Sequence, residues 1–184
     1  DGTFALDPEG GILAQPQGPV VGVDYVSVCA FVNWRRERED KPWRLPGELE
    51  WEKAARGVDH RLYPWGDTVD PTWARLRSSS RTRPCPAEVD TYPVDTSVYG
   101  VRGLGGNVAD WCGDVWSASG PDVAGGRAVT PPLRPEDPSP RNVRGGAWHA
   151  TATSAQTPGR LRAEHDQVSA QVGFRLARSL PDEG

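Results

Sequence analysis

The sequence of 184 residues contains no methionine, and only two of its 21 basic residues are lysine. No apolar run comes near the roughly 18 residues that a membrane-spanning helix needs, so we expect no membrane span. The net charge is −4 at pH 7, whereas nucleic-acid-binding domains usually carry a basic surface. These absences argue against a membrane-spanning helix within the sequence and against nucleic acid as the main partner.

Cysteine is also scarce, with only three residues: Cys29, Cys85 and Cys112. An odd number leaves at least one thiol unpaired and does not indicate a disulfide framework. Free thiols favour a reducing compartment such as the cytoplasm. Because the chain starts at Asp1 and lacks methionine, we also expect it to be part of a longer product.

Glycine and proline are abundant, with 21 and 18 residues, and only 36% of the residues are hydrophobic. This composition predicts much irregular structure within one domain. At this length the domain can bury a core without disulfide bonds or structural metal ions. Eight tryptophans outnumber the other aromatic types, and we expect several at the edge of the core because each indole N–H needs a partner.

A first helix is predicted over residues 24–38. Asp24 is placed to accept hydrogen bonds from the free N–H groups of the first turn, as an N-cap residue does. Apolar residues recur after it at helical spacing, which predicts the core-facing side as Val28, Phe31, Val32 and Trp34.

A second helix is predicted within Leu45–Gly57, with acids in its first turns, basic residues near its end and glycine after it. Its apolar stripe is predicted to be Leu49, Trp51, Ala54 and Ala55. The three acids Glu48, Glu50 and Glu52 are interpreted as a solvated face.

The remaining chain shows short strand-like stretches between long loops. We expect a strand or extended entry at 19–23, a glycine-rich turn followed by a strand within 103–116, and an extended surface loop over 117–142. The coarse picture is an α+β domain that is poor in regular structure.

Residues 148–172 are small and mostly polar, and they lie between two glycine-marked, strand-like ends at 144–148 and 173–178. Binding functions concentrate in loops held by a rigid frame, although a solvated connection without a role gives the same pattern. We predict a ligand-binding surface with these members: Trp148, His149, Thr151, Thr153, Ser154, Gln156, Arg160, Arg162 and His165.

Five motifs in order resemble the formylglycine-generating-enzyme (sulfatase-modifying factor) family. They are Pro19–Tyr25, Arg44–Gly57, Tyr63–Asp67, Gly106–Trp111, and Arg144–Trp148 with Gly173–Arg175. The resemblance implies an α+β, C-type-lectin-like fold with two helices, short antiparallel strands and long irregular loops. It assigns 19–178 to this domain, with an N-terminal arm or upstream remnant at 1–18 and a C-terminal tail at 179–184.

The resemblance carries different implications for two metal sites. The oxidase members bind copper through two cysteines, whose positions here hold Ala150 and Ala155, so we expect no copper and no oxidase chemistry. A family calcium site corresponds to the carboxylate of Asp110 with backbone oxygens of Gly106 and Val108, while Gly103 replaces a further side-chain ligand.

The leading hypothesis is a non-catalytic domain that binds a protein or small-molecule ligand through residues 148–172. Some bacterial relatives are variable proteins of diversity-generating retroelements, in which this segment carries targeted variation. One alternative is another enzyme of the superfamily, either a metal-dependent oxidase or an enzyme similar to the sulfoxide synthases, although the three histidines lack ligand-like spacing. Another alternative is an accessory domain of a larger chain, for example one fused to a kinase or protease.

Overall fold

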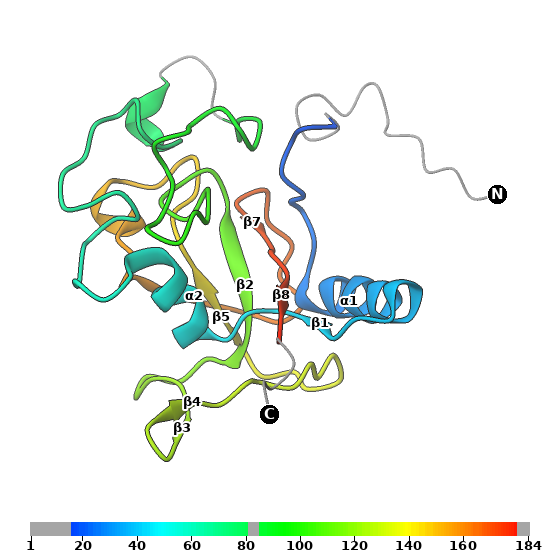
Figure 1. Cartoon of the computed structure of the whole chain (residues 1–184). Helices are drawn as coiled ribbons and strands as arrows, with labels where there is room; N and C mark the ends of the chain where they lie inside the picture. Colours follow the sequence, from blue (N-terminus) through cyan, green and yellow to red (C-terminus); the bar gives the residue numbers. More distant parts are fainter. Residues whose placement is uncertain (1–15, 81–84, 180–184) are drawn as a thin grey trace.

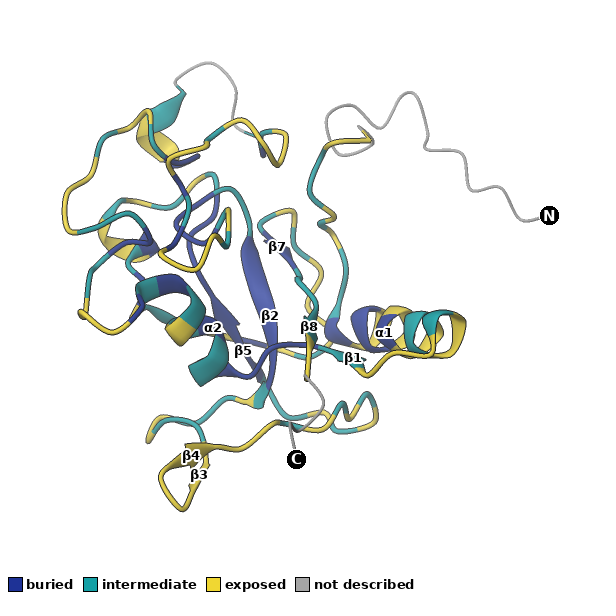
Figure 2. Cartoon of the chain, in the orientation of Figure 1, coloured by how far each residue is buried: buried dark blue, intermediate teal, exposed yellow. Residues whose placement is uncertain are grey.

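The computed structural model describes residues 16–80 and 85–179, and its centre is the strand β2, Ala109–Val115. The first five residues of β2 are buried, and the strand lies inside a four-stranded sheet of order β6-β5-β2-β7 (Figures 1 and 2). The other strands of this sheet are β5 (Arg141–Arg144), β6 (Arg160–Ala163) and β7 (Val172–Gly173). The pairs β2–β5 and β5–β6 are antiparallel, as predicted, and the short pair β2–β7 is parallel.

Both faces of β2 are covered, because successive side chains of a strand point to opposite faces of its sheet. Trp111 packs in the main core cluster with Tyr25 of the first helix, whereas Cys112 packs with Trp51 of the second. The two helices therefore lie on opposite sides of the sheet, as Figure 1 shows. This arrangement explains why the middle of β2 is buried without interruption.

The first helix, α1, spans Tyr25–Glu39, and Asp24 caps it by accepting a 2.7 Å hydrogen bond from the backbone nitrogen of Ser27. The predicted position of this helix is therefore confirmed to within one residue. Its buried face was predicted less well, since Phe31 and Trp34 are 37% and 50% exposed. The residues that are buried recur at helical spacing and include two of the predicted ones; they are Tyr25, Val28, Cys29 and Val32.

The second helix, α2, spans Glu48–Arg56 and begins after Gly47, whose backbone nitrogen donates to Glu50. It lies within the predicted range, but its buried side differs from the prediction. Trp51 and Ala55 are buried as expected, whereas Leu49 is only half-buried, and the third fully buried residue is Glu48.

The interpretation of the α2 acids as a solvated face is wrong, because each of them has an arginine partner. Glu48 is 1% exposed and pairs with Arg160 and Arg144, while Glu52 pairs with Arg144. Glu50 accepts two hydrogen bonds from Arg44, at 2.6 and 2.7 Å. A charge pattern along one helix cannot reveal these partners, since they come from strands that are distant in the sequence.

The loops contain more structure than predicted. Within the expected loop 117–142, strands β3 (Val123–Ala124) and β4 (Arg127–Ala128) form an exposed hairpin (Figure 2). A two-stranded sheet joins β1 (Trp43–Arg44) to β8 (Ala177–Arg178), and short 3₁₀ helices lie at Arg77–Ser79 (η2) and Thr153–Ala155 (η3).

Residues 19–23 do not form a strand, and Gly22 makes a bend with φ of 72° within them. The predicted arm and tail lie largely outside the described residues. Within the part of the chain that the structure describes, no helix is long and apolar enough to cross a membrane.

Candidate functional site

The predicted recognition segment, 148–172, begins after β5 and ends at β7, the two strands that flank β2. Both ends are therefore fixed by the central sheet, as predicted. The segment is less irregular than expected, because it contains η3 and β6. The strand β6 separates it into a first part, 148–159, and a last part, 164–171.

The backbone of the first part is held by the neighbouring loop around residues 61–79. The hydroxyl of Tyr63 donates to the carbonyl of Ala152 at 3.0 Å, and the backbone nitrogen of Arg77 donates to the carbonyl of Ala150 at 3.0 Å. The backbone nitrogen of Thr157 donates to the carbonyl of Leu62 at 2.8 Å. Although the backbone is fixed, several side chains remain exposed, namely His149, Thr151, Thr153 and Ser154.

The polar side chains of this first part contact one another. The hydroxyls of Thr151 and Ser154 are 2.8 Å apart, and the rings of Trp148 and His149 meet edge to face at 5.4 Å between centroids. The indole of Trp148 also donates to the carbonyl of Ala170, at 3.2 Å, which ties the two ends of the segment together. Gln156 is half-buried beside them.

The predicted members on β6 and beyond lie apart from this group. The guanidinium of Arg160 faces α2 and pairs with Glu48, while Arg162 pairs with Glu164 at 2.6 Å. The carbonyl of His165 accepts a hydrogen bond from the backbone nitrogen of Tyr25 at 3.0 Å, at the start of α1.

The two alanines at the copper-ligand positions lie in one apolar cluster. Ala155 is fully buried with Ala74 and Leu76, and Ala150 packs against the same cluster. Gly146 packs directly against Ala155, because a Cβ added to Gly146 would lie 2.5 Å from the Ala155 Cβ. These methyl groups supply neither a metal ligand nor a nucleophile.

The environment of Asp110 is already occupied by donors. Its Oδ2 accepts hydrogen bonds from Trp51 Nε1 at 2.8 Å and from Arg175 Nε at 2.6 Å. The same guanidinium donates to the carbonyls of Arg102 and Gly103, at 3.2 and 2.9 Å. Calcium requires six to eight oxygens, and a guanidinium already contacts both the carboxylate and the Gly103 carbonyl. These contacts fit calcium poorly, and binding there through Gly106 and Val108 stays a prediction.

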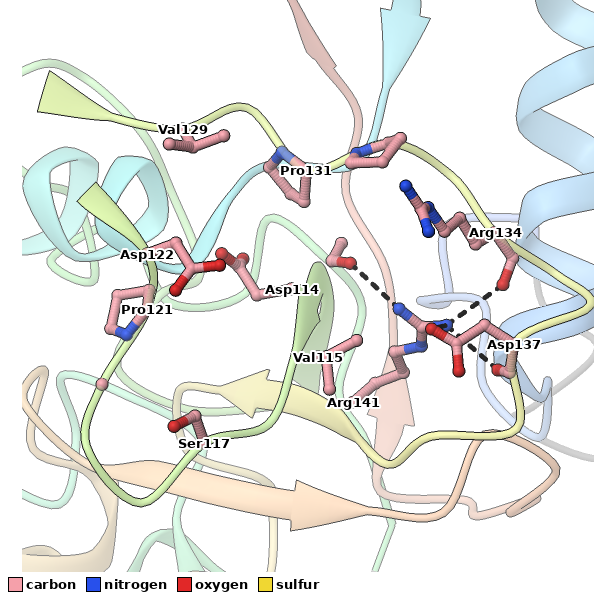
Figure 3. Close-up of a pocket in the computed structure, with 13 residues that line it drawn as sticks. Asp114, Val115, Ser117, Pro121, Asp122, Val129, Pro131, Arg134, Asp137 and Arg141 are labelled. Atoms are coloured by element: carbon pink, nitrogen blue, oxygen red, sulfur yellow. Dashed lines mark hydrogen bonds and ion pairs between the residues drawn. The ribbon is translucent and has the colours of Figure 1, made fainter. Parts of the chain in front are cut away.

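Sequence reasoning missed a pocket of about 380 Å³ at the other end of β2 (Figure 3). It lies between the end of β2, the hairpin loop and the proline-rich stretch that leads to β5. Asp114 and Asp122 line one side, and Arg134, Asp137 and Arg141 line another. The proline content and the polar turn residues of 117–142 gave no signal of a cavity, because its walls come from segments that meet only in the fold.

Residues 5–180 match the model of the family described as the sulfatase-modifying factor enzyme 1-like domain. A formylglycine-generating enzyme of Thermomonospora curvata is 30% identical, over 96% of this chain and 61% of its own length. The mouse protein named inactive C-alpha-formylglycine-generating enzyme 2 is also 30% identical, over 92% of this chain and 53% of its own length.

Two further similarities concern proteins of other kinds. The serine/threonine-protein kinase Pkn1 of Chlamydia trachomatis is 32% identical over 93% of this chain, which corresponds to only 26% of the kinase. The solved structure of Treponema denticola variable protein 1 superimposes with a TM-score of 0.72 at 24% identity, and the match covers 96% of this chain and 76% of that one. The chain thus spans less than two thirds of the formylglycine-generating relatives that it matches.

Proposed function

The chain belongs to the family of sulfatase-modifying factor enzyme 1-like domains, and on that premise we propose that it binds a ligand without performing the family's oxidase chemistry. The main observation behind this proposal is the pair of alanines at the positions where the oxidase members have copper ligands. Ala155 is buried among apolar side chains and Ala150 packs against them, so no thiolate is available there for copper or for a substrate cysteine. The relative named as inactive supports the idea that this family includes members without that activity.

The proposed recognition surface is residues 148–172, with its centre in 148–156. In that part the backbone is anchored by the carbonyl contacts to Tyr63 and Arg77, whereas the hydroxyl and imidazole side chains point outward. The exposed side chains of His149 and Thr153 can change without changing this backbone, since the contacts with Tyr63 and Arg77 do not involve them. This separation of frame and surface is what a recognition segment requires.

A narrower proposal is that this surface is diversified between related strains. The fold shared with the Treponema denticola variable protein supports a scaffold capable of that role, because the two chains superimpose over most of their length. Sequencing the locus in related isolates tests the proposal directly. We expect codon changes concentrated in residues 148–172, beside a reverse transcriptase gene, while an invariant segment would contradict diversification.

The non-catalytic assignment is tested by restoring the missing thiols. We expect the wild-type protein to bind no stoichiometric Cu(I) against a competing chelator and to leave a cysteine-containing peptide unoxidised in air. The double variant Ala150→Cys/Ala155→Cys should gain Cu(I) binding, and the single variant Ala152→Cys, with one thiol beside the same cluster, serves as the control. Peptide oxidation by the wild-type protein that depends on bound metal would overturn the assignment.

An accessory domain of a larger chain is the second candidate function. The observation that favours it is the Chlamydia trachomatis kinase, in which the matching region makes up only about a quarter of the protein. Reading the complete open reading frame decides this question. A kinase or other catalytic domain in the same frame would support it, and a frame that encodes this domain alone would contradict it.

A further inference from the structure

The four-stranded sheet has two edges, and they differ in what lies along them. At the β7 edge, the backbone of Val20 lies so close to Gly173 that a side chain there would clash with it. The backbone nitrogen of Gly22 also donates to the carbonyl of Ser169, at 2.9 Å, beside the same edge. At the other edge, β6 pairs with β5 along one side only, and Figure 3 shows it as the pale orange strand beside the yellow β5.

The outer side of β6 has backbone groups without a hydrogen-bond partner. In an antiparallel pair, alternate residues bond to the neighbouring strand, so two of the four residues of β6 direct their N–H and C=O groups away from β5. Among residues 16–80 and 85–179, no backbone group of 160–163 makes a hydrogen bond outside the β5–β6 pair. Leu161 and Arg162 are both exposed. An open edge of this kind is a template for a further strand.

The row of side chains on the α1 side of the sheet indicates what such a strand would carry. Trp111, Val143 and Leu161 lie opposite one another in successive strands, and the first two are buried. Leu161, at the end of the row, is 48% exposed. A strand added to β6 places a side chain beside Leu161, and an apolar one would extend the row and remove apolar surface from water.

The α2 side of the same edge carries arginine. Arg160 pairs with the buried Glu48 of α2, and Arg162 lies on the same face because alternate residues of a strand share a face. Arg162 pairs with Glu164 at 2.6 Å, and both side chains are 50% exposed. Exposed pairs of this kind contribute little to stability, so the carboxylate of a ligand can replace Glu164. The edge therefore favours a strand in which acidic and apolar residues alternate.

A second copy of the chain fits this edge less well. Two β6 strands related by a twofold axis would pair in a register centred on one residue, because residues opposite each other lie on the same face. A register centred on Leu161 places Arg162 opposite Arg160 of the copy, and one centred on Arg162 places the two Arg162 side chains opposite each other. Like charges directly opposite destabilise a strand pair, which favours a different polypeptide as the partner.

We propose that the outer side of β6 binds an extended polypeptide segment as an additional antiparallel strand, with an acidic residue opposite Arg162 and an apolar residue opposite Leu161. Main-chain hydrogen bonds provide the affinity, and the two side-chain contacts provide the selectivity. This inference rests on the proposed binding function of residues 148–172, and it identifies the part of that segment that contacts the ligand and the chemical class of the ligand.

The test is isothermal titration calorimetry of the full chain with the capped peptide acetyl-Thr-Glu-Val-Glu-Val-Thr-amide. We expect a dissociation constant below about 1 mM, and binding at least about tenfold weaker when lysine replaces both glutamates. Two further probes carry backbone N-methyl groups, one on both glutamates and the other on both valines. Because only one of these sets of N–H groups faces β6, one probe should bind at least about tenfold more weakly and the other should bind like the parent peptide.

Charge reversal on the protein tests the side-chain contact. Arg162→Glu replaces an exposed side chain, so it is expected to fold, to weaken the glutamate peptide by at least about tenfold and to strengthen the lysine peptide. The exposed Arg127→Glu, on β4, is the matched control and should leave both affinities unchanged. Equal binding of the two methylated probes, or unchanged peptide binding by Arg162→Glu, would overturn strand addition at β6.

One more variant separates this inference from the function on which it rests. The triple variant Thr151→Ala/Thr153→Ala/Ser154→Ala should bind the glutamate peptide normally. Binding that is lost in this variant but kept in Arg162→Glu would place the contact in 148–156, which overturns the inference and leaves the proposed function standing. No binding of the glutamate peptide would also overturn the inference, whereas the Cu(I) and sequencing tests decide the proposed function. A dimer in sedimentation velocity that Leu161→Asp dissociates would assign the edge to a second copy instead.

Discussion

Glu48 and Asp114 are neighbouring carboxylates that the fold treats in opposite ways. The backbone nitrogen of Glu48 donates to Asp114, so the two residues are in direct contact. Glu48 is almost completely buried and pairs with two arginines, whereas Asp114 is half-buried in a pocket and has no ion-pair partner in the described structure.

This difference separates a carboxylate that joins elements of the fold through ion pairs from one that has only a backbone hydrogen bond. A buried carboxylate must be compensated, because an isolated charge in a low-dielectric interior is very costly. Glu48 meets that requirement by joining α2 to β5 and β6. Asp114, near the end of β2, is only half-buried and accepts a hydrogen bond from the backbone nitrogen of Glu48, while burial raises the pKa of its carboxyl group.

The largest effect on stability is expected from removing the buried carboxylate of Glu48, which pairs with arginines. Glu48→Ala leaves Arg160 without a partner and Arg144 with one fewer, so it should lower the free energy of unfolding by about 3–5 kcal/mol. Urea unfolding measures this change, and Glu37→Ala on the exposed side of α1 is the matched control. A loss of less than about 1 kcal/mol, as for surface ion pairs, would show that the buried pairing is not structural.

A third carboxylate, Asp95, sharpens the comparison because it is buried but has only backbone donors. It is 2% exposed and accepts hydrogen bonds from the nitrogens of Leu104 and Gly105, and burial raises its pKa to about 6. The folded state then holds the proton more tightly than the unfolded state, so this group's contribution to stability is greatest below about pH 4 and decreases as pH rises through 6.

Asp95→Asn should abolish that dependence. Its change in unfolding free energy between pH 5 and pH 7 is expected to differ from that of the wild type by about 1–2 kcal/mol. Urea unfolding at the two pH values measures it, with Asp166→Asn as the control. Identical pH dependence in Asp95→Asn and the wild type would mean that the buried carboxylate titrates as it does in the unfolded chain.

For Asp114, which has no direct ion pair among the described residues, Asp114→Asn should leave the free energy of unfolding unchanged or raise it by up to about 1 kcal/mol at pH 7. The raised pKa of Asp114 means that its charged form is disfavoured in the fold, so an uncharged side chain of the same shape relieves that cost. Thermal and urea unfolding of the variant test the sign. A clear loss of stability would place Asp114 with Glu48 among the structural charges.

The side chains of the recognition surface should matter least for stability. Replacing Thr151, Thr153 and Ser154 together by alanine is expected to change the unfolding free energy by less than about 1 kcal/mol, because exposed positions rarely exceed 0.5 kcal/mol each. Thr157→Ala is the contrasting control, since its buried hydroxyl donates to the carbonyl of Arg61 at 3.1 Å. If the triple variant lowers the unfolding free energy as much as that control does, these side chains help to hold the backbone in place and are not free to vary.

Calcium is expected to give the smallest effect. The Asp110 oxygen that pairs with Arg175 already has two donors, so 1 mM calcium should stabilise the protein by less than about 0.4 kcal/mol, the value for a ligand at its Kd. Thermal unfolding with calcium or with EDTA measures it. A larger calcium-dependent increase, lost in Asp110→Asn, would establish the predicted site and would require Arg175 to move.

Local signals in the sequence predicted a substantial part of this fold. The cap at Asp24, the acids and the terminal glycine of α2, and the glycine-marked ends at 144–148 and 173–178 act over a few residues, so they can be read from neighbours in the chain. The same reading failed for Phe31, Trp34 and Glu48. Their burial depends on which side of each helix meets the sheet, and spacing alone does not decide that.

The sequence by itself determined the family, the two helices and the alanines at the copper-ligand positions, because these follow from residue identity and short-range order. Only the tertiary structure decided which charges are paired: it brings Arg144 and Arg160 to α2, and among the described residues it gives Asp114 no direct ion pair. Ion pairing and cavities depend on distances between segments far apart in the chain. Those distances are set by the packing of both helices on β2, which no local pattern encodes.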